Sequence, residues 1–375
     1  MDKLSATIAK LAALKTPVAA PASSSGRLLE LKAFGSNPGA LKARIYIPAR
    51  LADRPALVVV LHGCTQTAEG YNLGSGWSQL ADEQGFALLF PEQQRINNPN
   101  LCFNWFSPAD NARDRGEALS IRQMIGAMTD AHGVDDSRIF VTGLSAGGAM
   151  TSILLATYPE LFAGGAIIAG LPYGSASNVS QALAVMRGPG TYSGDELGDR
   201  VRGASGHTGP WPRVSIWHGT ADVTVNIANA DAILQQWISV QGLGGMPSAT
   251  DLVSGHRRRI WNDAAGRAVV EDYRIANMGH GTPLATGGKE ACGKAMPHML
   301  EAGISSTRHI AASWGLAGVT EPNAVPHTVE TDENETPGSR TERLERRDPV
   351  DAARAAKGGV QKIIEDALRS AGLMR

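Results

Sequence analysis

The chain has 375 residues, of which 43% are hydrophobic and 19% are charged, values typical of a globular protein. Its 35 basic and 36 acidic side chains give a net charge of −1, which argues against a nucleic-acid binder or a membrane-surface protein. No apolar run reaches the length of about 18 residues that predicts a transmembrane helix. Three cysteines are too few for a dense disulfide framework.

Residues 1–26 are expected to form an amphipathic helix and a linker. The linker, Pro17 to Ser25, is rich in Pro, Ala and Ser. This segment lacks the long apolar core and the cleavage site of a secretory signal, so a cytoplasmic location is expected. The apolar face of the helix is formed by Leu4, Ile8, Leu11 and Leu14.

The other end of the chain changes composition sharply. Residues 320–350 are highly charged and poor in large apolar side chains, which predicts a disordered linker. Residues 351–375 are expected to form an amphipathic helix that either docks on the domain or contacts a partner or polymer. Its apolar stripe consists of Val360, Ile363, Ile364 and Leu368.

Residues 27–319 are typical of one α/β domain. Leu28–Phe34 and Leu41–Ile47 are short alternating runs around a turn, which predicts an antiparallel hairpin. After it, apolar runs typical of strands covered on both faces begin at Ala56, Ala87, Arg138, Gly165 and Arg213. Helices are expected at Gly116–His132, Gly147–Tyr158 and Asn226–Gln241, and a strand at Val269–Asn277 precedes a helix at Pro297–Trp314. This alternation predicts a mainly parallel sheet with helices on both faces, whose chemistry lies at the carboxyl ends of the strands.

The strand that begins at Arg138 leads into a candidate nucleophile. Gly143-Leu144-Ser145-Ala146-Gly147 matches the G-x-S-x-G elbow, and a helix is expected directly after it. The flanking glycines are needed because side chains there would collide with neighbouring strands. Ser145 would also lie at a helix N-terminus, where developing negative charge is favoured. A chance glycine-serine turn is the alternative.

Asp222 is the candidate for the acidic member of a triad. It lies in the loop after the strand at Arg213, where this fold places the residue that orients the histidine. Its rivals fit less well, because Asp195 and Asp199 are expected in a glycine-rich loop and Asp231 on the following helix.

His280 is the candidate base among nine histidines. It follows the strand at Val269 between two glycines and completes the chain order Ser, Asp, His that is expected for an α/β-hydrolase fold. His62 and His218 end strands and are expected to be structural. His256 and His309 are expected to be solvated or structural.

Two backbone amides are candidates for an oxyanion hole. By position they are those of Cys64, in the loop after the Ala56 strand, and of Ala146, directly after the nucleophile. Such donors stabilise the charge that develops on a carbonyl oxygen.

Five separated motifs, over roughly Arg27 to Val319, together resemble the polyhydroxybutyrate depolymerase family of esterases, which is related to feruloyl and acetyl-xylan esterases. The motifs are LHGCTQ, the NWF within CFNWF, GLSAGGAM, WHGTADVTV and AGISSTRHIAASWGL. The resemblance implies a triad of Ser145, Asp222 and His280 and an oxyanion hole at Cys64 and Ala146. It also implies that Trp105 packs on bound acyl or polymer chain, although a core aromatic is the alternative.

Departures from the family leave the substrate open among polymer, soluble oligomers and small esters. No secretion signal and no β-rich polymer-binding module are evident. Cys64 and Cys102 both fall in loops at the expected active-site edge, so they either form a bridge or remain reduced, as in a reducing compartment.

The sequence therefore predicts a serine carboxylesterase without a metal or cofactor, since it lacks H-E-x-x-H, paired C-x-x-C and G-x-G-x-x-G motifs. A serine peptidase of the same fold is one alternative. The other is a hydrolase-like scaffold that binds through its C-terminal helix. The long glycine-rich stretch from Leu171 to Arg213 is expected to be a loop that forms a lid or pocket wall.

Overall fold

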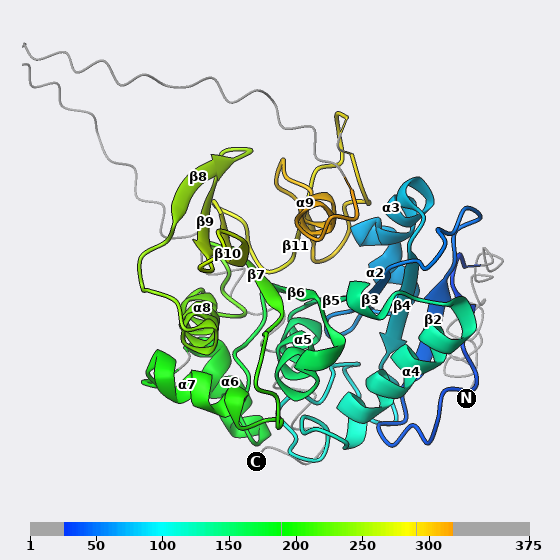
Figure 1. Cartoon of the computed structure of the whole chain (residues 1–375), viewed down its shortest axis with the longest axis horizontal. Coiled ribbons are helices and arrows are strands. Elements are labelled where there is room, and N and C mark those ends of the chain that lie inside the picture. The colour runs from blue at the N-terminus through cyan, green and yellow to red at the C-terminus, as the bar shows by residue number, and fades with distance from the viewer. Residues whose placement is uncertain (1–25, 189, 290, 318–375) are drawn as a thin grey trace, which may run out of the picture.

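The computed structural model describes residues 26–188, 190–289 and 291–317, and a ten-stranded sheet crosses this part of the chain (Figure 1). The strand order is β1-β2-β4-β3-β5-β6-β7-β10-β9-β8. The strands are β1 (Leu29–Glu30), β2 (Lys42–Tyr46), β3 (Leu57–Leu61), β4 (Ala87–Glu92), β5 (Ile139–Leu144), β6 (Gly164–Ile168), β7 (Arg213–Gly219), β8 (Ala249–Val253), β9 (His256–Asn262) and β10 (Ala268–Ile275). A separate parallel pair is formed by β11 (Thr282–Leu284) and β12 (Met299–Glu301).

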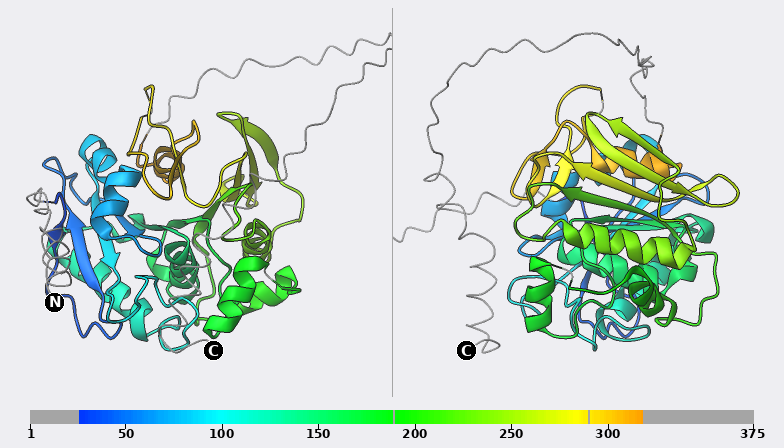
Figure 2. Two further views of the ribbon diagram at one scale, coloured as in Figure 1. Left: turned by 180° about the vertical axis from the view of Figure 1, so that it is seen from behind. Right: turned by 90° about the vertical axis from the view of Figure 1, so that its left-hand side faces the viewer.

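The six central strands, from β4 to β10 in the sheet order, pair in parallel, and antiparallel strands close both edges. Figure 1 shows β2 near one edge and β8 at the other, and Figure 2 gives a second view from the β8 side. The helices are α2 (Ala68–Ser75), α3 (Trp77–Gln84), α4 (Gly116–His132), α5 (Ala146–Thr157), α6 (Val179–Arg187), α7 (Gly194–Arg202), α8 (Ala228–Gln241) and α9 (Ser306–Ser313).

Alternate residues of the central strands pack into two different hydrophobic cores. In β3, Leu57, Val59 and Leu61 join a core with α4, α5 and α8. Val58 and Val60 join a second core with α2, α3 and α9 on the opposite face. Because side chains alternate along a strand, burial on both faces requires the continuous apolar run seen in the sequence.

The predicted α/β-hydrolase architecture is confirmed by this parallel sheet with helices on both faces. The N-terminal hairpin is present as β1 and β2, with Leu29 opposite Ile45, although β1 is only two residues long. The predicted helix Gly116–His132 has the same bounds as α4, and the residue after it, Gly133, caps its C-terminus with a φ of 59° that suits glycine.

Three segments differ from the prediction. The antiparallel pair β8–β9 was not predicted, because β8 is mostly exposed and β9 begins with three successive arginines after His256. The predicted helix Pro297–Trp314 is wrong in its first half, which contains β12, and α9 begins only at Ser306. The stretch from Leu171 to Arg213 is not one loop but carries α6 and α7, so Asp195 and Asp199 lie on a helix.

The predictions for residues 1–25 and 320–375, including both terminal helices and the charged linker, lie outside the described residues. In the part of the chain that the structure describes, every helix is too short or too polar to cross a membrane.

Candidate active site

Ser145 lies on a strained turn between β5 and α5. Its φ of 58° and ψ of −116° place a non-glycine residue in a sparsely populated backbone region. Two backbone hydrogen bonds hold this geometry: the Ser145 amide donates to the Ile168 carbonyl at 2.9 Å, and the Ala149 amide donates to the Ser145 carbonyl at 2.8 Å. The turn therefore fixes the serine at the carboxyl edge of the sheet.

The elbow glycines are required by close backbone contact. A β-carbon at Gly147 would lie 2.4 Å from the carbonyl oxygen of Leu61 and 2.5 Å from that of His62. At Gly143 it would lie 2.4 Å from the carbonyl oxygen of Gly147. Since such distances are shorter than van der Waals contact, the predicted role of both glycines agrees with the packing.

Asp222 and His280 lie in the loops that follow β7 and β10, and their side chains are hydrogen-bonded. The distance from His280 Nδ1 to Asp222 Oδ2 is 2.7 Å. Asp222 Oδ1 accepts the amide hydrogens of Thr224 at 2.8 Å and Val225 at 2.9 Å. The carboxylate is therefore oriented by its own loop and can hold the His280 ring with its Nε2 lone pair free.

A second histidine also contacts Asp222. His218 is fully buried, and its Nε2 lies 2.9 Å from the Val225 carbonyl oxygen and 3.4 Å from Asp222 Oδ2. Burial alone would raise the pKa of Asp222, but hydrogen bonds to His218 and His280 outweigh it and hold that pKa well below its ordinary value. The sequence predicted a structural His218, but nothing in its pattern indicated this contact with the triad candidate.

Ser145 and His280 line the same cavity, which has a volume of about 240 Å³. Within the described residues, no hydrogen bond joins Ser145 Oγ to His280 Nε2, a link that often tightens only when substrate binds. The wall is largely apolar. Its apolar residues include Leu144, Leu171, Ala182, Leu183, Met186 and Val225.

The backbone amides of Cys64 and Ala146 belong to residues that line this cavity. Neither amide has a protein hydrogen-bond partner among residues 26–188, 190–289 and 291–317. The predicted oxyanion hole requires amides of this kind, which no acceptor of the described chain occupies. Among all the described residues, those of this site included, no three His, Cys, Asp or Glu side chains gather in a way that could hold a metal ion.

Comparison with known proteins identifies the family. The model described as esterase PHB depolymerase matches residues 41–259. The chain is also 42% identical, over 303 residues, to poly(3-hydroxyalkanoate) depolymerase C of Paucimonas lemoignei, with 80% of this chain and 73% of that protein covered. The chain belongs to the esterase PHB depolymerase family. It is an α/β-hydrolase that acts on carboxylic ester bonds.

The chain is also similar to esterases that are named for other substrates. Feruloyl esterase B of Talaromyces funiculosus is 32% identical and matches 68% of this chain and 73% of that protein. The solved structure of an acetyl xylan esterase from Aspergillus awamori matches with a TM-score of 0.63 and 28% identity, over 68% of this chain and 94% of that one.

Trp105 of the esterase lines the cavity and is also part of a hydrophobic core. Its side chain is buried, and its ring packs edge-on against Phe106 with 5.6 Å between centroids. The substrate-contact and core interpretations made from the sequence are therefore compatible, because one face of a core residue can form the wall of a site.

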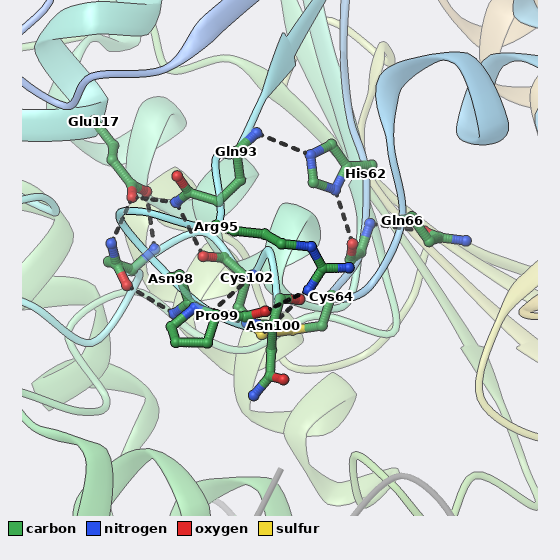
Figure 3. Close-up of a disulfide and its surroundings, with 12 residues drawn as sticks. His62, Cys64, Gln66, Gln93, Arg95, Asn98, Pro99, Asn100, Cys102 and Glu117 are labelled. Carbon is green, nitrogen blue, oxygen red and sulfur yellow. Dashed lines mark hydrogen bonds between the residues drawn. A yellow bond between two sulfur atoms is a disulfide. The ribbon is translucent and has the colours of Figure 1, made fainter. Parts of the chain in front are cut away.

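The segment between β4 and α4 supplies much of the cavity wall and is fixed at two points. Cys102 forms a disulfide with Cys64, so the bridged alternative is the one present. On the other side, Glu117 of α4 accepts a hydrogen bond from Gln93 Nε2 (Figure 3). It also accepts hydrogen bonds from the Asn104 amide and side chain. Burial raises the pKa of Glu117 to about 8, further helped by nearby Asp110 and opposed by these hydrogen bonds.

Loss of the disulfide is expected to lower the free energy of unfolding by about 4 kcal/mol. The bridge joins residues 38 apart, and in the chain-entropy model a cross-link of that span restricts the unfolded chain by this amount. Urea unfolding of a Cys64→Ser/Cys102→Ser variant against the unmodified chain measures it. The unmodified chain in dithiothreitol should have the same free energy of unfolding as the variant. Dithiothreitol should not change the free energy of unfolding of the variant itself.

A thiol count provides the independent check of this bridge. Because Cys292 is the free cysteine of the described residues, the denatured chain should show one thiol before reduction and three after it. Three thiols without reduction, or equal stability of the two chains, would contradict the expectation.

Proposed function

We propose that this esterase hydrolyses hydroxyalkanoate esters, as polyester, oligomer or small ester, through a triad of Ser145, His280 and Asp222. The observation that carries the proposal is the 2.7 Å His280–Asp222 hydrogen bond beside an apolar cavity that Ser145 also lines. The 42% identity to a poly(3-hydroxyalkanoate) depolymerase supports this substrate class over the feruloyl and acetylxylan esters named for the relatives at 32–35% identity.

In the first half of the reaction, Ser145 Oγ attacks the ester carbonyl carbon while His280 Nε2 accepts the hydroxyl proton. Asp222 stabilises the imidazolium that forms. The negative oxygen of the tetrahedral intermediate accepts hydrogen bonds from the amides of Cys64 and Ala146. When the intermediate collapses, the ester C–O bond breaks and the alcohol leaves with the proton from His280.

In the second half, water attacks the acyl-enzyme. His280 accepts a proton from that water, the same two amides stabilise the second oxyanion, and the acid leaves as Ser145 recovers its proton. The apolar cavity wall suits the acyl chain of a hydroxyalkanoate. No step needs a group other than the substrate, water and residues of this chain.

A hydrolysis panel tests the substrate class. The substrates are a film of poly(3-hydroxybutyrate), its soluble oligomers, a short-chain nitrophenyl ester, a methyl hydroxycinnamate, acetylated xylan and a chromogenic peptide. We expect the hydroxybutyrate esters to give the highest kcat/KM and the peptide to give no turnover. Preference for the hydroxycinnamate or acetylated xylan would replace the substrate proposal, and preference for the peptide would indicate a peptidase.

A further inference from the structure

Asn100, in the segment between β4 and α4, differs from the three other asparagines that line the cavity. The Asn98 side chain donates to Asn104 Oδ1 at 3.0 Å. The Asn97 side chain donates to the Gly39 carbonyl oxygen at 2.9 Å. The side chain of Asn100 is half-buried and has no hydrogen-bond partner in the described parts of the chain. Of these four asparagines, Asn100 is therefore the one whose side-chain amide is free to bind a ligand in the cavity.

The backbone of Asn100 is held on both sides although its side chain is free. Its amide donates to Asn98 Oδ1 at 3.0 Å, and its carbonyl oxygen accepts from the Thr65 amide at 2.6 Å. Two residues further along, Cys102 is bonded to Cys64. Figure 3 shows the Asn100 side chain extending away from these contacts, with no dashed line to its amide group. Because the backbone is already fixed, little conformational freedom is left for this short side chain to lose when it binds a ligand.

The contacts of Asn100 place it beside one of the proposed oxyanion donors. Thr65, which it binds, directly follows Cys64, and Asn100, Cys64 and Ser145 all line the same cavity. In a 3-hydroxyacyl group, only carbon 2 separates carbon 3 from the carbonyl carbon, so the oxygen on carbon 3 stays close to the carbonyl oxygen. We propose that Asn100 is a specificity-determining residue whose side-chain amide binds this oxygen while Ser145 attacks the carbonyl carbon.

An amide side chain suits both forms in which the oxygen on carbon 3 occurs. Inside a polyester it belongs to an ester group, whose oxygens only accept hydrogen bonds, whereas at the end of an oligomer it is a hydroxyl. Asn100 Nδ2 can donate to either form, and Oδ1 can accept from the hydroxyl. A plain acyl chain has no oxygen there and would cover the amide without giving it a partner. This role rests on the proposed function, because it concerns hydroxyalkanoate esters attacked by Ser145.

Two esters that differ only in this oxygen test the proposal: nitrophenyl 3-hydroxybutyrate and nitrophenyl butyrate. We expect the unmodified chain to hydrolyse the 3-hydroxy ester with the higher kcat/KM. Asn100→Leu replaces the amide by an apolar group of similar size and shape. It should lower kcat/KM for the 3-hydroxy ester about 3- to 10-fold, the effect of one hydrogen bond, and leave kcat/KM for the butyrate within about twofold.

Soluble oligomers give a second readout. In oligomers of 6-hydroxyhexanoate the oxygen lies on carbon 6, too far along the acyl chain to meet the same amide, so Asn100→Leu should lower the rate on 3-hydroxybutyrate oligomers relative to these by about the same factor. The matched control is Asn262→Leu. Asn262 is also half-buried, but it ends β9 and does not line the cavity. This control should keep the substrate preferences of the unmodified chain.

An Asn100→Leu variant that keeps the unmodified ratio of kcat/KM between the two nitrophenyl esters would overturn the proposal. So would an unmodified chain that does not prefer the 3-hydroxy ester. If the leucine variant does not fold, Asn100→Ala, which also removes the amide, decides the matter by the same ratio. Failure of the proposed function looks different: the unmodified chain would then prefer the hydroxycinnamate or acetylated xylan in the hydrolysis panel, or would hydrolyse esters without Ser145.

Discussion

Replacement of Ser145 by alanine is expected to lower kcat by about 10⁴- to 10⁶-fold on every ester that the chain hydrolyses. The substitution removes the only oxygen through which the acyl-enzyme can form, while His280, Asp222 and both oxyanion amides remain. The backbone strain at φ 58° remains too, because alanine carries the same β-carbon. The melting temperature should therefore change little, and the loss is one of chemistry rather than of folding.

Steady-state hydrolysis of a short-chain nitrophenyl ester measures this loss, and labelling by a fluorophosphonate measures the nucleophile directly. Ser180→Ala is a suitable control, since Ser180 is an exposed serine of α6. The control should be labelled and active, whereas Ser145→Ala should be neither. Ordinary esterase rates in Ser145→Ala would end the assignment of the nucleophile.

The site could be predicted largely because its residues follow buried parallel strands. β5 and β7 carry mostly β-branched and other apolar residues, and β10 is largely buried although it includes Glu271, Asp272 and Arg274. Each strand ends in a turn rich in glycine, and parallel strands bring their carboxyl ends to one edge. Linear sequence thus placed Ser145, Asp222 and His280 at one edge before any contact between them was known.

The edge hairpin β8–β9 escaped prediction for the opposite reason. Its burial comes from charge pairing rather than from an apolar run: Arg259 reaches the fully buried Asp272 of β10 at 2.7 Å. Neighbouring Arg258 pairs with Asp251 on β8. A row of arginines in a sequence is more typical of a solvated face, so the strand is evident only when its acidic partners are seen.

The stretch from Leu171 to Arg213 contains helix-capping residues, but its glycine-rich composition led to the prediction of a loop. Ser193 and Glu196 form a reciprocal capping box at the start of α7, and Asn178 caps α6. The frequent glycines and prolines favoured a loop instead. Because α6 supplies Val179, Ala182 and Leu183 to the cavity, the expectation of a pocket wall agrees with the structure although its conformation was wrong.

Contacts between distant buried polar groups were beyond sequence reasoning. The amide of Gln93 meets His62 across 31 residues, and the Gln93 side chain meets Glu117 across 24. Polar side chains carry no periodic pattern that identifies their partners, so only the folded chain shows that their hydrogen bonds are made.

The Cys64–Cys102 disulfide lies next to these polar contacts. It is typical of oxidising compartments, whereas the expected cytoplasmic location rests on residues outside the described structure.

Replacement of Asp222 by asparagine is expected to lower kcat by about 10⁴-fold. The Thr224 and Val225 amides donate to Oδ1, so they should keep the amide oxygen of the new side chain in that position. The NH₂ group then replaces Oδ2 and faces His280 Nδ1. That ring must accept at Nδ1 and carry its hydrogen on Nε2, the tautomer that cannot take a proton from Ser145.

The rival aspartate Asp199 provides the matched control, because it is an exposed residue of α7 that pairs with Arg202. Asp199→Asn should retain kcat within about twofold, and an equal loss in both variants would contradict the assignment of Asp222.

The pH dependence of stability provides a second test of Asp222. Since the pKa of Asp222 is lowered in the folded chain, its carboxylate stabilises the fold above the unfolded pKa of about 4, and that contribution is lost as the pH falls below it. The difference in unfolding free energy between the unmodified chain and Asp222→Asn should therefore be largest at neutral pH and shrink on acidification. A gap that stays constant from pH 7 to pH 3 would mean that His218 and His280 do not hold the charged form.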